Sequence, residues 1–537
     1  MKALSKCVKA FAGLSIVLLP AMGGNCVHAA NPYLPLWEYI PDGEPYVFED
    51  PDCPGKFRVY IYGSHDSRKT DYCGLEQVVW SAPVDDLNDW RYDGVIFESK
   101  TNAVGDTLNV GGTGDVLFAP DVAEVTGADG SKTYYLYPNN QSGGRNGMVA
   151  KASRPDGPFK VSNWSKENPC LTDGVFRFDP GVLVDDDGRV YGYWGFERSY
   201  AAEIDSATMA TVKKGCDIVE DMIPSRDQDT TFRFFEASSM RKIKDKYVFV
   251  YSRWTNDGEF GLPATNYTLA YAYSDNPLGP FTYGGTIIDG RGRDTDADGK
   301  VIPTATPFGN THGSIIEING KWYVFYHRQS GTNEYARQAM VAPVDVTVEE
   351  GKGGKVIISE AEYTSEGFET DGLNPLKRYS AGIACYYTGP SEARHSYPDV
   401  YFPGSYVRPY YGDEERFEKP YDLSENVTPV VNNTAGSVVG YKYYNFTDTP
   451  VDTLVLDILP LGHDGHIDVM IDSPWEKKGG KKIGSLDISG DMSQKRADMD
   501  VALSGMQGVS GKHAIYLVIS SDTQSTPLFE LYELMFK

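Results

Sequence analysis

The chain has 537 residues, a formal net charge of −25 and 13% aromatic residues. A single domain of this length is uncommon, so two or more domains are expected. The negative charge disfavours binding to nucleic acid or to anionic membranes, and it suits a neutral substrate.

Residues 1–30 have the features of a secretory signal. A start with three lysines is followed by an apolar run, Phe11–Ala21, and by a small-residue cleavage motif at His28–Ala30. The apolar run is short for a bilayer span, and no other stretch approaches one. We therefore expect a secreted or periplasmic protein without a membrane-spanning segment; association with the cell surface stays open as an alternative.

Five cysteines remain after such processing, and their spacing fits no metal motif. They are Cys53, Cys73, Cys170, Cys216 and Cys385. Two readings stay open: Cys53 pairs with Cys73 in an oxidising compartment, or all five are separate thiols.

One pattern recurs five times between residues 40 and 350. An ionisable residue opens a short apolar stretch, a turn follows, and an aromatic-rich strand closes the unit. The openers are Glu44, Asp121, Asp179, Glu236 and His312. Short strands in repeated units favour an all-β fold, a five-bladed β-propeller over residues 31–350. A sandwich or a Greek-key barrel would explain the strands but not the repeated openers.

The composition changes near residue 350. Residues 351–425 hold few periodic cues, and we expect them to form a connecting segment packed on the propeller. Alternating strands resume over residues 426–537, which predicts a β-sandwich of the jelly-roll type.

The openers should meet, because the innermost strand of every propeller blade begins beside the central channel. Carboxylates that share one cavity raise each other's pKa values, whereas a nearby imidazolium or arginine lowers them. Such a ring can supply an acid and a base at the same pH.

Several short sequence motifs together resemble glycoside hydrolase family 43, and the resemblance covers roughly residues 35–350. The motifs are Phe118–Val122, Asp179–Tyr191, Phe235–Met240, Thr311–Ser314 and two Gly-Pro-Phe turns. The resemblance implies a five-bladed propeller that acts as an inverting, exo-acting glycosidase. It implies arabinofuranosidic, galactofuranosidic, xylosidic or galactosidic linkages in an oligosaccharide or polysaccharide, and no cofactor for the chemistry.

The same resemblance implies three catalytic roles. Glu236 matches the general acid, and Asp179 matches the aspartate that tunes and orients the acid. The base is normally an aspartate followed by proline in the first blade, where this chain has Glu44 and Pro45. Glu44 is our expected base; the alternatives are Asp42, two residues earlier, or no base at all.

The remaining candidates are expected to bind substrate or to brace the site. His312 matches a histidine at the channel axis that helps to hold a structural calcium or a water, and Arg337 matches an arginine that contacts substrate. Asp121 either contacts substrate or braces the second blade. His65 and Asp66 end the first inner hairpin and are expected at the pocket rim.

The C-terminal sandwich weakly resembles carbohydrate-binding module family 6, through Val438–Phe446 and Gly511–Leu517. It either binds glycan or buttresses the propeller. Because a glutamate stands at the base position, an alternative function also stays open for the protein: a propeller that binds glycan without catalysis.

Overall fold

The computed structural model describes residues 30–68, 71–99, 115–141, 145, 147–168, 171–409 and 427–537. Except for Ala30, the predicted secretory signal lies outside these residues, as does Cys170. Over the described ranges, no helix combines the length and the apolarity that a bilayer crossing requires.

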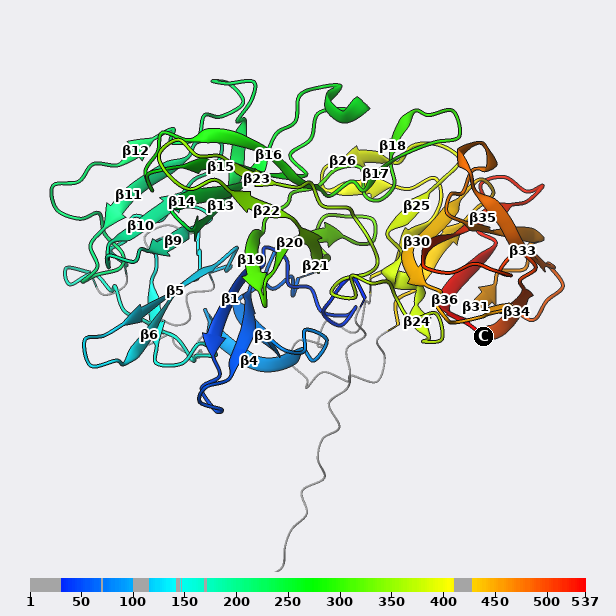
Figure 1. Ribbon diagram of the computed structural model, residues 1–537, viewed down its shortest axis with the longest axis horizontal. Helices are drawn as coiled ribbons and strands as arrows, with labels where there is room; N and C mark the ends of the chain where they lie inside the picture. Colours follow the sequence, from blue (N-terminus) through cyan, green and yellow to red (C-terminus); the bar gives the residue numbers. More distant parts are fainter. Residues whose placement is uncertain are drawn as a thin grey trace, which may run out of the picture.

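Five antiparallel sheets are arranged as the blades of a β-propeller, which confirms the predicted fold (Figure 1). The first holds β1 (Glu44–Glu49), β2 (Phe57–Tyr62), β3 (Glu76–Pro83) and β4 (Arg91–Glu98). The second holds β5 (Asp121–Thr126), β6 (Lys132–Tyr137), β7 (Ala150–Ala152) and β8 (Lys160–Val161). The third holds β9 (Gly181–Val184), β10 (Val190–Trp194), β11 (Tyr200–Ile204) and β12 (Val219–Glu220). The fourth holds β13 (Phe234–Ile243), β14 (Lys246–Arg253), β15 (Thr268–Ser274) and β16 (Thr282–Asp289), and the fifth β19 (Ser314–Ile318), β20 (Lys321–Gln329) and β21 (Arg337–Val344).

The strands follow from β-branched and aromatic residues that pack between neighbouring blades. All eight residues of β14 are buried, because both of its faces are covered. The fifth blade is completed by the chain before β1. The Asn31 side chain exchanges hydrogen bonds with the backbone of Val341, and the Tyr33 amide donates to the Ala339 carbonyl. The first and last segments of the propeller thus meet and close the ring.

Two further sheets form the C-terminal sandwich, on the right of Figure 1. One contains β24 (Tyr379–Ser380), β28 (Tyr406–Val407), β29 (Val430–Asn433), β31 (Thr453–Pro460), β34 (Ala497–Ala502) and β36 (Phe529–Phe536). The other contains β25 (Tyr386–Thr388), β30 (Val438–Asn445), β32 (Gly465–Ile471), β33 (Lys481–Ile488) and β35 (Lys512–Ser520). Because β24, β25 and β28 belong to these sheets, part of the segment expected to connect the domains is built into the sandwich.

Short hairpins and turns complete the structure. The hairpins pair β17 (Arg293–Thr295) with β18 (Val301–Pro303), β22 (Val346–Val348) with β23 (Val356–Ile358), and β26 (Arg394–Ser396) with β27 (Asp399–Tyr401). The described part of the chain also contains the 3-10 helices η2 (Glu259–Gly261), η3 (Ala381–Ile383) and η5 (Glu476–Lys478).

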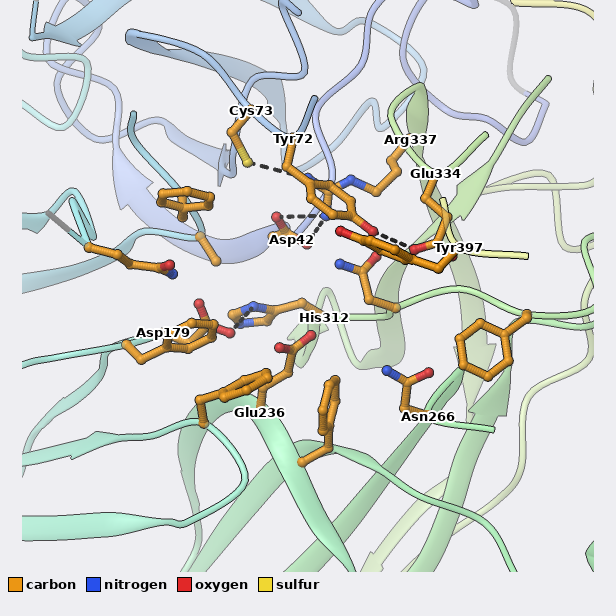
Figure 2. A pocket seen from close by; sticks show the side chains of 18 of the residues that line it. Asp42, Tyr72, Cys73, Asp179, Glu236, Asn266, His312, Glu334, Arg337 and Tyr397 are labelled. Carbon is orange, nitrogen blue, oxygen red and sulfur yellow. Dashed lines mark hydrogen bonds and ion pairs between the residues drawn. The ribbon is translucent and has the colours of Figure 1, made fainter. Parts of the chain in front are cut away.

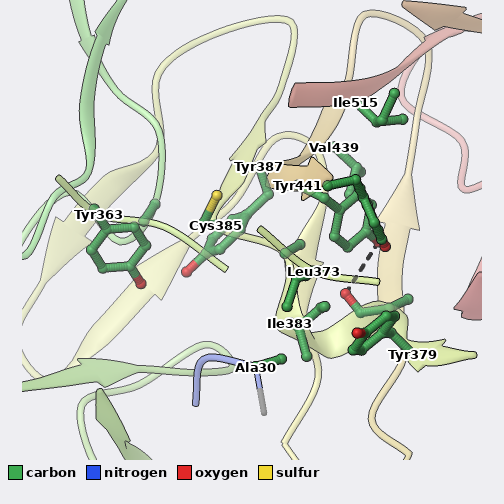
Figure 3. Packing of buried hydrophobic residues seen from close by; sticks show 14 of the residues in the cluster. Ala30, Tyr363, Leu373, Tyr379, Ile383, Cys385, Tyr387, Val439, Tyr441 and Ile515 are labelled. Carbon is green, nitrogen blue, oxygen red and sulfur yellow. Dashed lines mark hydrogen bonds between the residues drawn. The ribbon is translucent and has the colours of Figure 1, made fainter. Parts of the chain in front are cut away.

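The propeller and the sandwich share one buried apolar cluster. It runs from Val250 and Ile315 in the propeller through Tyr363 and Tyr387 to Ile515 in the sandwich. Figure 3 shows its middle part, where side chains from the connecting segment pack against β30. The sandwich is therefore held to the propeller by a continuous core.

The structure decides between the two readings of the first cysteine pair. Cys53 is exposed, Cys73 is buried, and both are free thiols. The alternative disulfide between them is therefore absent.

Candidate active site

A pocket of about 540 Å³ opens at one mouth of the propeller channel (Figure 2). This volume lies in the range of small-molecule sites. Its ionisable lining includes Asp42, Asp179, Glu236, His312, Glu334 and Arg337. Much of the remaining wall is aromatic, with Tyr72, Phe118, Phe178, Phe196, Phe235, Trp254, Phe308 and Tyr397. Charged groups at one end and aromatic faces around them suit a ligand with hydroxyl groups and apolar C–H faces.

Three ionisable residues of the pocket come just before the inner strand of a blade. Asp42 lies two residues before β1, Asp179 two before β9, and His312 two before β19. Asp42 and Asp179 both adopt a left-handed backbone, with φ of 61° and 43°. Non-glycine residues rarely adopt this conformation, and it recurs at functional sites.

Glu236 reaches the pocket by another route, because it sits inside β13. The pairing of β13 with β14 shifts register on both sides of Glu236, and the next residue, Ala237, has φ of 71°. Such a bulge bends a strand and turns a side chain in a new direction. Figure 2 shows Glu236 on the opposite side of His312 from Asp42.

The Asp42 carboxylate is held in its charged form. Arg337 Nη1 lies 3.1 and 3.2 Å from its two oxygens, and Ser64 Oγ donates to Oδ2 at 2.5 Å. Burial acts to raise the pKa of Asp42, but Arg337 and the neighbouring histidines together outweigh it and hold the pKa well below its usual range.

His327 keeps the backbone at Asp42 in place. The Asp42 amide donates to His327 Nδ1 at 3.2 Å, and His327 Nε2 lies 2.9 Å from the Asn310 carbonyl oxygen. This pattern fits a neutral ring that donates from Nε2 and accepts at Nδ1. Burial also lowers the pKa of His327, in agreement with the neutral form.

Arg337 is itself held in place by Asp66 and Tyr72. Asp66 accepts two hydrogen bonds from it, at 2.9 Å from Nε and 2.8 Å from Nη2, in the fork geometry of a strong ion pair. The Tyr72 ring lies 4.9 Å from the guanidinium carbon. Asp66 thus serves the site through Arg337; it does not line the pocket.

The electrostatics of Glu236 oppose those of Asp42. Burial and the neighbouring Asp179 carboxylate together raise the pKa of Glu236 well above its usual value. Burial likewise raises the pKa of Asp179 to about 6, although His312 acts in the other direction. Asp179 is positioned by Asn139 Nδ2 at 2.9 Å and by the Ala237 amide at 3.3 Å. One pocket therefore combines a carboxyl group with a raised pKa, Glu236, and a carboxylate with a lowered pKa, Asp42.

Glu44, the base expected from the sequence, lies outside the pocket lining. Arg241 Nη2 donates to Glu44 Oε2 at 2.7 Å, and Ser239 Oγ donates to the same oxygen at 3.1 Å. Although burial opposes it, Arg241 lowers the pKa of Glu44. Glu44 is two residues farther along the channel than Asp42, and its charge is neutralised there.

Asp121 is placed like Glu44, one blade further on. Ala119, two residues earlier, lines the pocket, whereas Asp121 does not. Its carboxylate accepts hydrogen bonds from the Tyr46 hydroxyl and from the Val182 amide, both at 2.6 Å. These bonds tie the first three blades together, which agrees with a bracing role. We call Glu44, Asp121 and Arg241 the inner layer.

His65 is also absent from the pocket lining. Its ring is buried, with Nε2 3.1 Å from Glu38 and Nδ1 3.5 Å from Glu76. These carboxylates overcome the effect of burial and raise the pKa of His65 to about 9. His65 therefore belongs to a buried charge cluster behind the pocket, and the expectation that it lies at the rim is wrong.

His312 lies between the pocket and the inner layer. Its Nδ1 is 3.7 Å from Asp179 Oδ2, and its Nε2 is 3.8 Å from Glu44 Oε1. Despite burial, the surrounding carboxylates raise the pKa of His312 to about 9. A protonated ring here would attract Asp179 on one side and Glu44 on the other.

The described residues contain no group of three or more His, Cys, Asp or Glu side chains that could hold a metal ion. The two atoms facing each other at the axis are His312 Nε2 and Glu44 Oε1. Arg241 already neutralises the charge of Glu44. The calcium expected beside His312 stays a prediction.

Glu334, His395 and Tyr397 are among the pocket residues that carry no signal in the sequence patterns. Glu334 lies between β20 and β21, and the other two belong to the β26–β27 region, far beyond the propeller repeats. Asp42 had a usable signal, because residues two apart in an extended segment face the same side. Counting back two positions from each inner strand would have selected it.

Comparison with known proteins agrees with this geometry. The family profile described as Glycosyl hydrolases family 43 matches residues 57–350. A "Xylosidase/arabinosidase" of Thermoclostridium stercorarium is 36% identical over 386 residues, which cover 66% of this chain and 71% of the relative. An "Arabinoxylan arabinofuranohydrolase" of Paenibacillus polymyxa is 26% identical, over 67% of this chain and 54% of the relative.

One solved structure is similar over almost its full length. It is a family 43 arabinoxylan arabinofuranohydrolase from Bacillus subtilis, in complex with cellotetraose, with 22% identity and a TM-score of 0.43. The alignment covers 96% of this chain and 98% of the other. The match to the family profile and the relative with 36% identity show the family of this chain independently of this solved structure.

Proposed function

Because this chain belongs to glycosyl hydrolases family 43 and is a glycosidase, we propose that it is an inverting, exo-acting enzyme with Glu236 as acid and Asp42 as base. The observation that carries the proposal is the opposite electrostatic setting of two carboxyl groups in one pocket. The acid of a glycosidase must be protonated and its base must be ionised at the same pH.

Glu236 gives its proton to the glycosidic oxygen as the bond to the anomeric carbon breaks. Burial and the negative charge of Asp179 keep that proton on Glu236 before the reaction. After the transfer, His312 near Asp179 limits the accumulation of negative charge. Asp179 is a positioning residue in this scheme, since it acts through the pKa and the orientation of Glu236.

Asp42 takes a proton from the water that attacks the anomeric carbon from the opposite face of the ring. In an inverting enzyme the two carboxyl groups stand about 6.5–9.5 Å apart, which leaves room for this water. Arg337 keeps Asp42 ionised, and Ser64 orients it. The two proton transfers together add one water across the glycosidic bond. Glu236 has then lost a proton and Asp42 has gained one, and proton exchange with solvent restores both residues.

Asp42 removes the argument for the rival function. A glycan-binding propeller without catalysis was motivated by the glutamate found where family 43 has its aspartate base. With Asp42 in the pocket and Glu44 paired to Arg241, the missing aspartate is supplied two residues earlier.

We propose a terminal arabinofuranosyl or xylosyl unit as the substrate, released from an oligosaccharide or polysaccharide. The names of the relatives support these two sugars, and the burial of the three carboxyl groups supports an exo mode. Asp42 and Asp179 are each 5% exposed and Glu236 is 8% exposed, so a chain end fits better than the middle of a chain.

The test is hydrolysis of 4-nitrophenyl glycosides of arabinofuranose, xylose, galactofuranose and galactose, followed by proton NMR of the fresh product. We expect release of arabinofuranose or xylose with the anomeric configuration inverted. Retention of configuration, or turnover of none of the four by folded protein, would refute the proposal.

Export and calcium remain predictions. The amino-terminal segment supports a secreted or periplasmic enzyme, and fractionation of the host cell with processing of residues 1–30 would test it. A calcium ion bound near His312 would have to be held largely through water, and calorimetry with Ca²⁺ would test it.

A further inference from the structure

The β26–β27 hairpin comes from the segment after the propeller, yet it forms part of the pocket wall. His395 in β26 and Tyr397 in the turn both line the pocket together with Glu236 and Trp254. Figure 2 shows Tyr397 beside Glu334 and Tyr72. The site is therefore built from two parts of the chain that the repeats do not connect.

Backbone contacts fix this hairpin to the fifth blade. The Val400 amide donates to the Thr332 carbonyl at 2.9 Å, and Asn333 forms a β-bridge with Asp399. Both partners belong to the loop that leads into β21 and Arg337. The hairpin is thus attached to the same loop that positions the arginine beside Asp42.

Side chains fix the hairpin a second time. The buried Glu334 carboxylate contacts His395 Nε2 with one oxygen and accepts the Tyr72 hydroxyl with the other. The His395 ring stacks on Phe308, with the centroids 4.3 Å apart and the planes at 20°. Hydrogen bonds to a carboxylate are strong, so Glu334 clamps the hairpin to the first blade.

Tyr397 is the more exposed of two exposed aromatic residues in the wall, the other being Phe196. Tyr397 is 67% exposed and Phe196 47%, whereas the three buried carboxyl residues of the pocket are at most 8% exposed. The pocket therefore has a buried end, where the chemistry takes place, and an open rim. An aromatic ring at an open rim, carried on a fixed hairpin, offers a flat face to an incoming ring.

We propose that Tyr397 is a specificity-determining residue that stacks on the leaving-group sugar, so that the enzyme prefers a glycan leaving group to a small alcohol. The inference rests on the proposed function, in which the terminal sugar occupies the buried end. The sugar attached to it must then leave through the rim, past Tyr397. The expected ligand at the rim is a pyranose ring of a neutral oligosaccharide, which has the apolar C–H faces that stacking needs.

The test compares two substrates of the sugar that the wild type prefers: an oligosaccharide and the methyl glycoside, whose leaving group is too small to reach the hairpin. We expect Tyr397→Ala to lower the ratio of kcat/KM for the oligosaccharide to that for the methyl glycoside by about three- to tenfold, mainly through KM. Tyr397→Phe keeps the ring and should stay within about twofold of the wild type.

Tyr401→Ala is the matched control. Tyr401 lies on the same hairpin and is 59% exposed, but it does not line the pocket. It should leave the ratio unchanged. An unchanged ratio in Tyr397→Ala, or an equal fall in Tyr401→Ala, would overturn the proposal while hydrolysis by the wild type still supports the proposed function.

Binding to a variant without the acid separates this inference from catalysis. In Glu236→Gln, added Tyr397→Ala should raise the Kd of an arabinoxylo-oligosaccharide about three- to tenfold in calorimetry. This result would support the hairpin site even if the wild type hydrolysed none of the panel. An unchanged Kd, or absence of binding by Glu236→Gln itself, would count against it.

Discussion

The pocket and the inner layer behind it contain the same kinds of residue in the same channel. Asp42, Asp179 and Glu236 in the pocket are buried, as are Glu44 and Asp121 in the inner layer. The difference lies in their partners. Glu44 has an arginine at 2.7 Å, and Asp121 is saturated by hydrogen bonds from Tyr46 and Val182. Both regions hold one carboxyl group with a raised pKa and one with a lowered pKa, since burial and the charge of Glu44 raise the pKa of Asp121 to about 7. Neither burial nor opposite pKa shifts separate catalytic from structural carboxylates in this molecule; access to the pocket does.

The largest expected effect is that of Glu236→Gln. Loss of the general acid should lower kcat on an oligosaccharide by about 10²–10⁴-fold, because a sugar is a poor leaving group without protonation. The loss should be smaller on a 2,4-dinitrophenyl glycoside, whose leaving group needs no proton. Thermal melting should stay within about 2 °C of the wild type. Equal losses on both substrates would argue against Glu236 as the acid.

Asp179→Asn should have the next largest effect and should change the pH profile. The Asp179 charge raises the pKa of Glu236, so its removal lowers that pKa. The alkaline limb of kcat/KM, where the acid loses its proton, should therefore move to lower pH. We expect a loss of activity of about tenfold to a hundredfold near neutral pH, with partial recovery at lower pH. A limb that stays in place would contradict the tuning role.

Arg337→Gln tests what keeps the pKa of Asp42 low in the same pocket. The Arg337 guanidinium holds the pKa of Asp42 below its usual range, so its loss should raise that pKa. The acid limb of kcat/KM should then appear at higher pH than in the wild type. At neutral pH we expect a loss of about tenfold, which kinetics across pH 4–8 would measure.

Glu44→Gln should have the smallest effect on activity and the clearest effect on stability. It leaves Arg241 buried without its carboxylate, which costs about 3 kcal/mol of unfolding free energy. The pKa of Glu44 is lowered in the folded protein, so the ion pair stabilises above the unfolded pKa and less as the pH falls. The difference in unfolding free energy between the wild type and Glu44→Gln should thus become smaller below about pH 4.

Glu44→Gln combined with Arg241→Met is the control for that result. Removing both partners should recover part of the lost stability, because no buried charge is left unpaired. In denaturant unfolding, a double variant less stable than Glu44→Gln would refute the pairing argument. A large loss of kcat in folded Glu44→Gln would assign it a catalytic role after all.

Much of the fold was readable from the sequence, because strand alternation and repeated openers are local features. Asp179, Glu236 and His312 were placed at the channel from these features. Glu44 was ranked above Asp42 because it precedes a proline, whereas the pocket lining includes Asp42 and not Glu44. The positions of Arg241 and Arg337, which separate the two carboxylates, follow from the fold and not from local sequence. His395 and Tyr397 were out of reach, since the docking of a distant hairpin leaves no periodic trace.

The most direct test of the account is azide rescue of the two candidate bases. In Asp42→Gly, a small cavity replaces the carboxylate, and azide can take the place of the attacking water. We predict that azide restores turnover of an aryl glycoside by Asp42→Gly and yields a glycosyl azide of inverted configuration, whereas Glu44→Gly shows no rescue. Rescue of Glu44→Gly, with none for Asp42→Gly, would contradict the assignment of the base to the pocket.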